Sequence, residues 1–429
     1  MKIVVSTIIK FSIVAILIIP NFYNISASSF EDTPQSSFEE NKEVYLMRGE
    51  HYIHLNAKDD VENFNLRFAF PPDYQYQVPI LLELYDDTSA NLLNYKIEED
   101  INYPNKVINF SIGAMKNNDT LMLHFSCWVI VQNHEFEDLP YYVRFPKKSN
   151  LPEETKTWLT STEVVQKNRL LIKLKAHQLR GLSSNLIRFA EKISKFIKNH
   201  RYYLFVIQLS FGLFISQDAF TTLLINGENV GRSHLACAFF RSYNVPARVL
   251  LVHNDQGFWT QMHYMIEYFC PGYGWVLIDS TKGQTPYATK RQIINRICYP
   301  EDEMDTKSDY IYPFMKGEER WLWLNNDNIV PVYVDCNSGS KSQMFYEGHM
   351  EPDKFTADYA FLLSQLVYRQ YEKYLGLNLT GQNYEYFKNA MQYHLDAINA
   401  FQQSNINSYL DYMYLAYNEY LKIIILNTM

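Results

Sequence analysis

The 429-residue sequence predicts an α+β protein of several domains, and three stretches support this fold class. Short runs of alternating apolar and polar residues, typical of strands, fill the region from Glu43 to about Pro146. A helix followed by an antiparallel hairpin is expected between Gly227 and Thr281. Helical periodicity returns from Asp353 to the C-terminus. A chain of this length can bury the cores of two or three domains.

The N-terminus has the pattern of an export signal. Lys2 and Lys10 precede an apolar run at 11–20, and small residues allow cleavage after Ala27. We therefore predict a signal peptide over residues 1–27 and a secreted or cell-surface protein.

The alternative to cleavage is an uncleaved anchor, because apolar character already begins at Ile3. The span to Pro20 is short for a bilayer, which needs about 20 residues. Membrane contact is therefore expected only if this segment is retained. Residues 28–42 are polar and predict a flexible leader.

A β-sandwich of about seven strands is predicted over residues 43–150, because strand-like runs are bounded there by Pro, Asn and Asp. The candidate strands are 44–46, 64–70, 80–84, 107–112, 121–125 and 141–145.

The following segment is expected to be helical. Two amphipathic stretches lie at 164–179 and 184–199, and Thr162 is a candidate helix cap. Residues 202–214 are very apolar but too few to cross a bilayer, so they predict a buried segment.

The central stretch predicts one helix and three strands. The helix should cover 229–243, and Pro246 should end it because proline disfavours helical conformation in the residue before it. Strands are expected at 247–253, 263–269 and 275–279, with a Pro-Gly-Tyr-Gly turn between the last two.

His263 on one strand of this hairpin and Asp279 on the next have the layout of a cysteine-type triad. In such a triad the imidazole takes a thiol's proton and the carboxylate fixes its tautomer. The chain here resembles the transglutaminase-like superfamily, whose core is a papain-like fold. The matching segments are Arg241-Ser242-Tyr243-Asn244-Val245-Pro246-Ala247-Arg248, His263-Tyr264-Met265-Ile266-Glu267 and Gly274-Trp275-Val276-Leu277-Ile278-Asp279.

Three departures from the family pattern stand out. Asn244 replaces a glycine, and Met265 replaces a tryptophan. The family's spacing, counted back from Pro246, places Asn229 where the nucleophilic cysteine belongs. A carboxamide has no acidic proton and cannot replace a thiolate. Asn229 could instead cap the helix start.

Other residues could in principle supply the nucleophile. Cys237 lies about 12 Å further along the helix on a different face, and an inert, buried thiol is the favoured interpretation. Ser233 shares a face with Asn229 but lies about 6 Å away along the axis. His234 is either a second polar group near the cleft or a histidine satisfied within the fold.

Cysteine usage and charge predict no metal, cofactor or nucleic-acid partner. The five cysteines form no CxxC pair, which argues against a zinc site. One disulfide among Cys270, Cys298 and Cys336 is conceivable in an oxidising compartment. The net charge of −8 gives no sign of nucleic-acid binding.

Three further regions complete the predicted order. A transglutaminase-like core over 151–290 is followed by a mixed extension over 291–350, with a strand at 329–334. The aromatic cluster 318–323 is either a binding platform or core packing. A helical module over 351–429 should contain three helices, split near 376–377 and 402–404.

The function that fits these features is an exported transglutaminase-like protein that lacks thiol catalysis and acts as a peptide- or protein-binding scaffold. The alternative is an active acyl transferase or peptidase with a nucleophile not located. In that case His263 is the general base and Asp279 its orienter, while Arg248 and Trp275 are structural.

Overall fold

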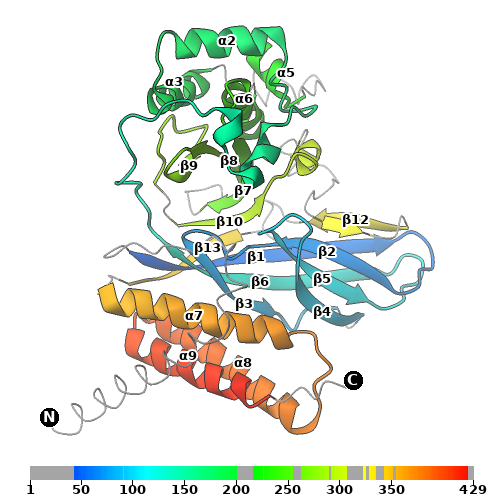
Figure 1. Ribbon diagram of the computed structural model, residues 1–429. Helices are drawn as coiled ribbons and strands as arrows, with labels where there is room; N and C mark the ends of the chain where they lie inside the picture. Colours follow the sequence, from blue (N-terminus) through cyan, green and yellow to red (C-terminus); the bar gives the residue numbers. More distant parts are fainter. Residues whose placement is uncertain are drawn as a thin grey trace, which may run out of the picture. The chain divides into compact units, whose positions relative to one another are not determined.

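Two antiparallel sheets form the N-terminal part of the protein in the computed structural model (Figure 1). Their first six strands are β1 (Val44–Ala57), β2 (Phe64–Phe70), β3 (Gln77–Leu84), β4 (Leu92–Glu99), β5 (Lys106–Ile112) and β6 (Thr120–Gln132). One sheet has the order β12-β1-β6-β3, with β13 also paired to β1, and the other has the order β11-β2-β5-β4. The three later strands are β11 (Leu322–Leu324), β12 (Ile329–Val334) and β13 (Gln343–Met350). The α+β fold class, with this sheet domain first, is confirmed.

The structure describes residues 43–89, 91–200, 216–225, 227–254, 262–288, 291–306, 322–324, 328–334, 343–350 and 354–423. The predicted signal peptide and leader, the apolar segment 202–214, most of the cluster 318–323 and Cys336 lie outside these residues. No helix among the described residues is long and apolar enough to cross a membrane.

Apolar side chains from both sheets form a common core. Phe125 on β6 contacts Phe68 on β2 and Phe110 on β5, with ring centroids 5.6 Å and 5.3 Å apart. Burial alternates along most of β1, as expected for a strand with one face on the core.

One predicted strand, 141–145, is wrong. Tyr141 and Tyr142 are exposed there, and only Arg144 forms an isolated bridge, to Asn185. The Asn185 carboxamide explains this, because it donates to Tyr141 O at 3.0 Å and accepts from Val143 N at 3.2 Å. Strand β4 was not predicted, since it is largely polar and exposed.

A third sheet, with the order β10-β7-β8-β9, forms the central core with four helices. Its strands are β7 (Ala247–Asn254), β8 (Met262–Cys270), β9 (Gly274–Ile278) and β10 (Gln292–Ile297). The helices are α2 (Leu170–Arg180), α3 (Leu186–Asn199), α5 (Ala219–Leu224) and α6 (Asn229–Ser242). Helix α6 is buried from Val230 to Arg241, and Phe240 stacks on Tyr268 of β8 at 4.8 Å.

Helix α2 begins six residues later than predicted. Thr162 does not cap a helix; its hydroxyl accepts from Val165 N at 3.0 Å and closes a local turn. Val164 and Val165 are fully buried, and Val164 O accepts from Ala219 N at 2.8 Å. These contacts hold the segment in bends and turns instead of the first turns of a helix.

Strands from the predicted 291–350 extension are divided between the sheets. β10 joins the core sheet, while β12 and β13 pair with β1 and β11 pairs with β2. The predicted domain boundaries at 290 and 350 stay predictions.

Three C-terminal helices follow, as predicted: α7 (Lys354–Tyr374), α8 (Gly381–Gln402) and α9 (Ile406–Leu421). They share the hydrophobic core of the N-terminal sheets. The Tyr371 hydroxyl on α7 donates to Leu82 O of β3 at 3.1 Å.

Candidate functional site

Asn229, His263 and Asp279 come together in the core. Asn229 is the first residue of α6, His263 lies on β8, and Asp279 directly follows β9. Asn229 Nδ2 is 3.1 Å from His263 Nδ1. On the other side of the ring, His263 Nε2 is 3.2 Å from Asp279 Oδ1. The three residues proposed from the sequence therefore form one continuous hydrogen-bonded chain.

The packing of α6 on the hairpin positions this chain. β8 and β9 pair antiparallel up to Ile278, so Asp279 leaves the sheet beside β8. Ser233 Oγ lies 2.8 Å from Asn229 O, 3.2 Å from Tyr264 O and 3.1 Å from Ser280 Oγ. Through these contacts Ser233 holds the start of α6 against β8. The role of Ser280 as a hydrogen-bond partner of Ser233 could not be predicted from the sequence.

The Asp279 carboxylate is fully buried. Burial alone would raise the pKa of Asp279, but hydrogen bonds from His263 and Thr281 outweigh it and hold the pKa below its ordinary value. Thr281 donates to Asp279 Oδ1 from its amide at 2.8 Å and from its hydroxyl at 2.6 Å. The sequence Asp-Ser-Thr was the available signal for this support, because hydroxyl side chains often bond to nearby carboxylates.

An ionised Asp279 fixes the tautomer of His263. The carboxylate can only accept, so Nε2 of the neutral ring carries the proton. Nδ1 is then an acceptor, and the Asn229 amide donates to it. This tautomer would leave Nδ1 free to take a proton from a thiol at the position of Asn229.

Asn229 does not cap the helix. The N-cap residue is Glu228, and it makes no side-chain cap hydrogen bond. The Asn229 carboxamide instead contacts His263, and its Oδ1 has no hydrogen-bond partner among the described residues. The carboxamide of Asn229 therefore contacts the His263 imidazole instead of capping the start of α6.

The four described thiols, Cys127, Cys237, Cys270 and Cys298, are all buried and free. A bond between Cys270 and Cys298 is therefore not formed. Burial raises the pKa of Cys237, and it raises the pKa of Cys270 to about 11. Thiolates are the reactive form, so these groups are poor nucleophiles.

His234 does not belong to the chain of Asn229, His263 and Asp279. Its side chain is fully buried, and its Nδ1 lies 2.6 Å from Gln217 O. His234 therefore has the structural position that was one of its two predicted alternatives.

A buried cation lies behind the hairpin. Arg248 Cζ is 3.7 Å from the Trp275 ring centroid, and Arg248 Nε donates to Glu267 Oε2 at 2.8 Å. Tyr74, from the N-terminal sheet domain, donates to the same carboxylate at 3.1 Å. Arg248 and Trp275 were expected to be structural residues, and they contact each other in this way. Tyr74 could not be found from sequence, because it lies 193 residues from Glu267.

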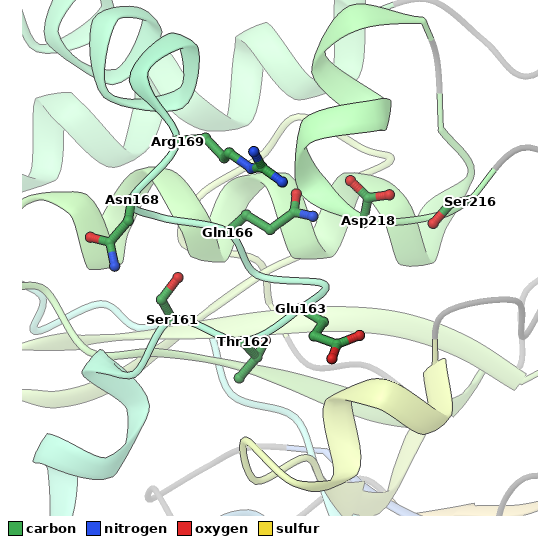
Figure 2. Close-up of a pocket in the computed structure, with 8 residues that line it drawn as sticks. All are labelled: Ser161, Thr162, Glu163, Gln166, Asn168, Arg169, Ser216 and Asp218. Atoms are coloured by element: carbon green, nitrogen blue, oxygen red, sulfur yellow. The ribbon is translucent and has the colours of Figure 1, made fainter.

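Two open cavities lie elsewhere on the core. One, of about 810 Å³, is lined by polar side chains of the segment before α2 and the start of α5, as Figure 2 shows. Those residues are Ser161, Thr162, Glu163, Gln166, Asn168, Arg169, Ser216 and Asp218. Another, of about 780 Å³, lies between α3 and residues 283–288. No group of three potential metal-ligating side chains occurs among the residues that the structure describes.

Comparison with known proteins identifies the core. The family model of the transglutaminase-like superfamily matches residues 175–280, which include Asn229, His263 and Asp279. No curated protein matches the sequence.

Two solved structures are similar to the chain. One is described as "a Putative Cysteine Protease from Cytophaga hutchinsonii" (13% identity, TM-score 0.44), with 71% of this chain and 98% of that chain covered. The other is described as "a putative protease from Parabacteroides distasonis" (12% identity, TM-score 0.23), with 53% and 42% covered. Both TM-scores are below 0.5, so the assignment rests on the family model and on the layout of α6, β8 and β9. The chain contains a transglutaminase-like core over residues 175–280.

Proposed function

We propose that this is an exported transglutaminase-like protein that has lost thiol catalysis and uses its inherited site to bind a peptide or protein segment. One observation carries the proposal: the group 3.1 Å from His263 Nδ1 is the Asn229 carboxamide. An amide nitrogen has a delocalised lone pair and no proton that imidazole can remove. It cannot form the covalent acyl intermediate of a cysteine-type enzyme.

The buried state of the described thiols supports the same proposal. Cys237 is the only cysteine on α6, and its side chain is fully buried with its pKa raised by burial. No thiol among the described residues is hydrogen-bonded to the His263 ring. The alternative, an active enzyme with another nucleophile, would need a thiol that reaches this ring.

The remaining polar groups suit recognition of a peptide backbone. The His263 side chain is 16% exposed, so the site is not sealed from solvent. Asn229 is partly exposed, and the contact with His263 uses only one of the two N–H groups of its amide. A peptide carbonyl could therefore accept a hydrogen bond from the second N–H of Asn229, while the ring of His263 holds this amide in place.

Alkylation of the native protein tests for the missing nucleophile. We expect iodoacetamide at pH 7 to label the four described cysteines slowly, because they are buried, and we expect His263→Ala to change the rate of no cysteine. Peptide mapping by mass spectrometry gives the rate for each cysteine, and labelling in denaturant shows that every site is detectable. One rapidly labelled cysteine that slows in His263→Ala would establish the active-enzyme alternative.

Peptide display tests the binding function. Peptides selected from a random library on the wild-type protein should bind Asn229→Ala/His263→Ala about tenfold more weakly, because the Asn229 amide donor and the imidazole that orients it are both lost. Fluorescence anisotropy measures the affinities. The matched control is Asn168→Ala/His177→Ala, two exposed residues outside the triad. Failure to select any peptide, or equal affinity for the wild type and the triad variant, would argue against the proposal.

A further inference from the structure

Cationic side chains are concentrated in α2, α3 and the residues next to them. Residues 164–200 contain nine of the chain's 39 lysines and arginines but only one of its 47 acidic residues, Glu191. The whole chain has a net charge of −8, so the remainder is strongly acidic. Such charge segregation is typical of a surface that binds an anionic partner.

The same helices expose apolar side chains. Leu170 is 70% exposed, Leu174 is 54% exposed, and Leu182 in the turn after α2 is fully exposed. Only Ile172 and Ala176 of α2 are buried. Figure 1 shows α2 along the outside of the group formed with α3, α5 and α6. The outer face of this helix therefore presents leucines where a solvent-facing helix ordinarily presents polar residues.

Exposed cations lie next to two of these leucines, and an exposed Arg–Tyr pair is formed from α3. Lys173 is exposed beside Leu174, and Lys192 Nζ lies 4.0 Å from the β-carbon position of Gly181, next to Leu182. On α3, Arg188 Nη2 donates at 2.7 Å to the hydroxyl of Tyr141, which is 75% exposed. We call this set the α2 surface: Tyr141, Leu170, Lys173, Leu174, Leu182, Arg188 and Lys192.

We propose that the α2 surface binds an anionic phospholipid bilayer, with the leucines in the interfacial layer and the cations at the lipid phosphates. A helix that presents leucines and lysines together suits this environment, because it gains from apolar burial and from charge attraction. Tyrosine is also favoured at membrane interfaces. A nucleic-acid backbone would use the cations but gain little from the leucines.

The acidic remainder of the chain should orient the protein on the bilayer. It is repelled by an anionic bilayer, while the α2 surface is attracted, so the protein is oriented with this face toward the lipid. This contact does not involve residues 1–27, which were the only membrane-binding segment expected from sequence.

Vesicle co-sedimentation with the full chain tests the proposal. We expect binding to vesicles of phosphatidylcholine with 30% phosphatidylglycerol, weakened by 0.5 M NaCl, and much less binding to phosphatidylcholine alone. Lys173→Glu/Arg188→Glu/Lys192→Glu should lower the partition coefficient at least about tenfold. The matched control Lys116→Glu/Lys282→Glu/Lys388→Glu has the same net charge but changes exposed lysines elsewhere, and it should bind more tightly than the α2-surface variant.

A second pair of variants tests the leucines. Leu170→Gln/Leu174→Gln/Leu182→Gln should keep the wild-type unfolding temperature and bind vesicles more weakly. Leu362→Gln/Leu366→Gln, which changes exposed leucines of α7, should bind as the wild type does. Equal binding to neutral vesicles, or equal losses in the two charge variants, would overturn the proposal. Unfolding of the α2 leucine variant would also overturn the proposal. Retention of the wild-type protein on heparin without binding to vesicles would do the same.

Discussion

Asn229→Cys is expected to create a reactive thiol in a site that otherwise keeps its geometry. The new sulfur would stand near His263 Nδ1, whose tautomer Asp279 already fixes. It would also lie in the first turn of α6, where the helix dipole favours an anion. Both effects lower a thiol pKa, and catalytic thiols in such surroundings have pKa values from about 3.5 to 7.5.

The expected rate gain depends on pH. If the new thiol has a pKa of about 6.5 rather than about 8.5, its thiolate fraction at pH 6 rises about 75-fold. The lower basicity costs about eightfold in intrinsic nucleophilicity, so a net gain of about tenfold remains. Alkylation by iodoacetamide at pH 6 should therefore be about ten times faster than for an ordinary exposed thiol.

Ser149→Cys supplies that ordinary thiol, since Ser149 is exposed. His263→Ala combined with Asn229→Cys should bring the rate down toward the Ser149→Cys value. If Asn229→Cys reacts no faster than Ser149→Cys and is unaffected by His263→Ala, the site has not kept a triad geometry. New peptide cleavage or amine incorporation by Asn229→Cys would show that binding and oxyanion stabilisation also survive.

Arg248→Met is expected to cost about 3–5 kcal/mol in the free energy of unfolding. The Arg248 and Glu267 side chains are only 3% and 1% exposed, and Arg248 Nη2 lies 2.7 Å from Glu267 Oε2. Removal of the guanidinium leaves a buried carboxylate without its charge partner, and it also removes the stacking on Trp275. Urea denaturation of the wild type and variant measures the change.

Two further variants separate the possible causes. Arg248→Met/Glu267→Leu should recover much of the lost stability, because no charge is then left unpaired in the core. Lys422→Met removes a surface pair with Glu419, in which the lysine side chain is 49% exposed, and should change stability far less than Arg248→Met does. A loss for Arg248→Met as small as that for Lys422→Met would contradict the importance of the buried pair.

The parts of the fold that sequence predicted well depend on local patterns. Both ends of helix α6 and of strands β7 to β9 were predicted to within one residue, because apolar periodicity and the breaks at Pro246 and Gly272 coincide. Asn229, His263 and Asp279 were predicted as one site because three short segments fit a known pattern. Their proximity is now a geometric fact, while their role stays a proposal.

The parts that could not be predicted depend on contacts between distant segments. Val164 was assigned to a helix, but its carbonyl pairs with Ala219 instead. Asn229 is a good helix cap by local preference, yet its carboxamide contacts a histidine 34 residues away. The pairing of β1 with β12 and β13 crosses almost 300 residues and has no local signature.

This pairing has a consequence for synthesis of the protein. One edge of β1 is covered by β6, but the other is covered by strands that extend to Met350. A nascent chain that has left the ribosome only as far as the end of the core still has β1 as an open edge, available for pairing with another chain. Completion of the sheet that contains β1 must therefore wait until the chain has emerged beyond Met350.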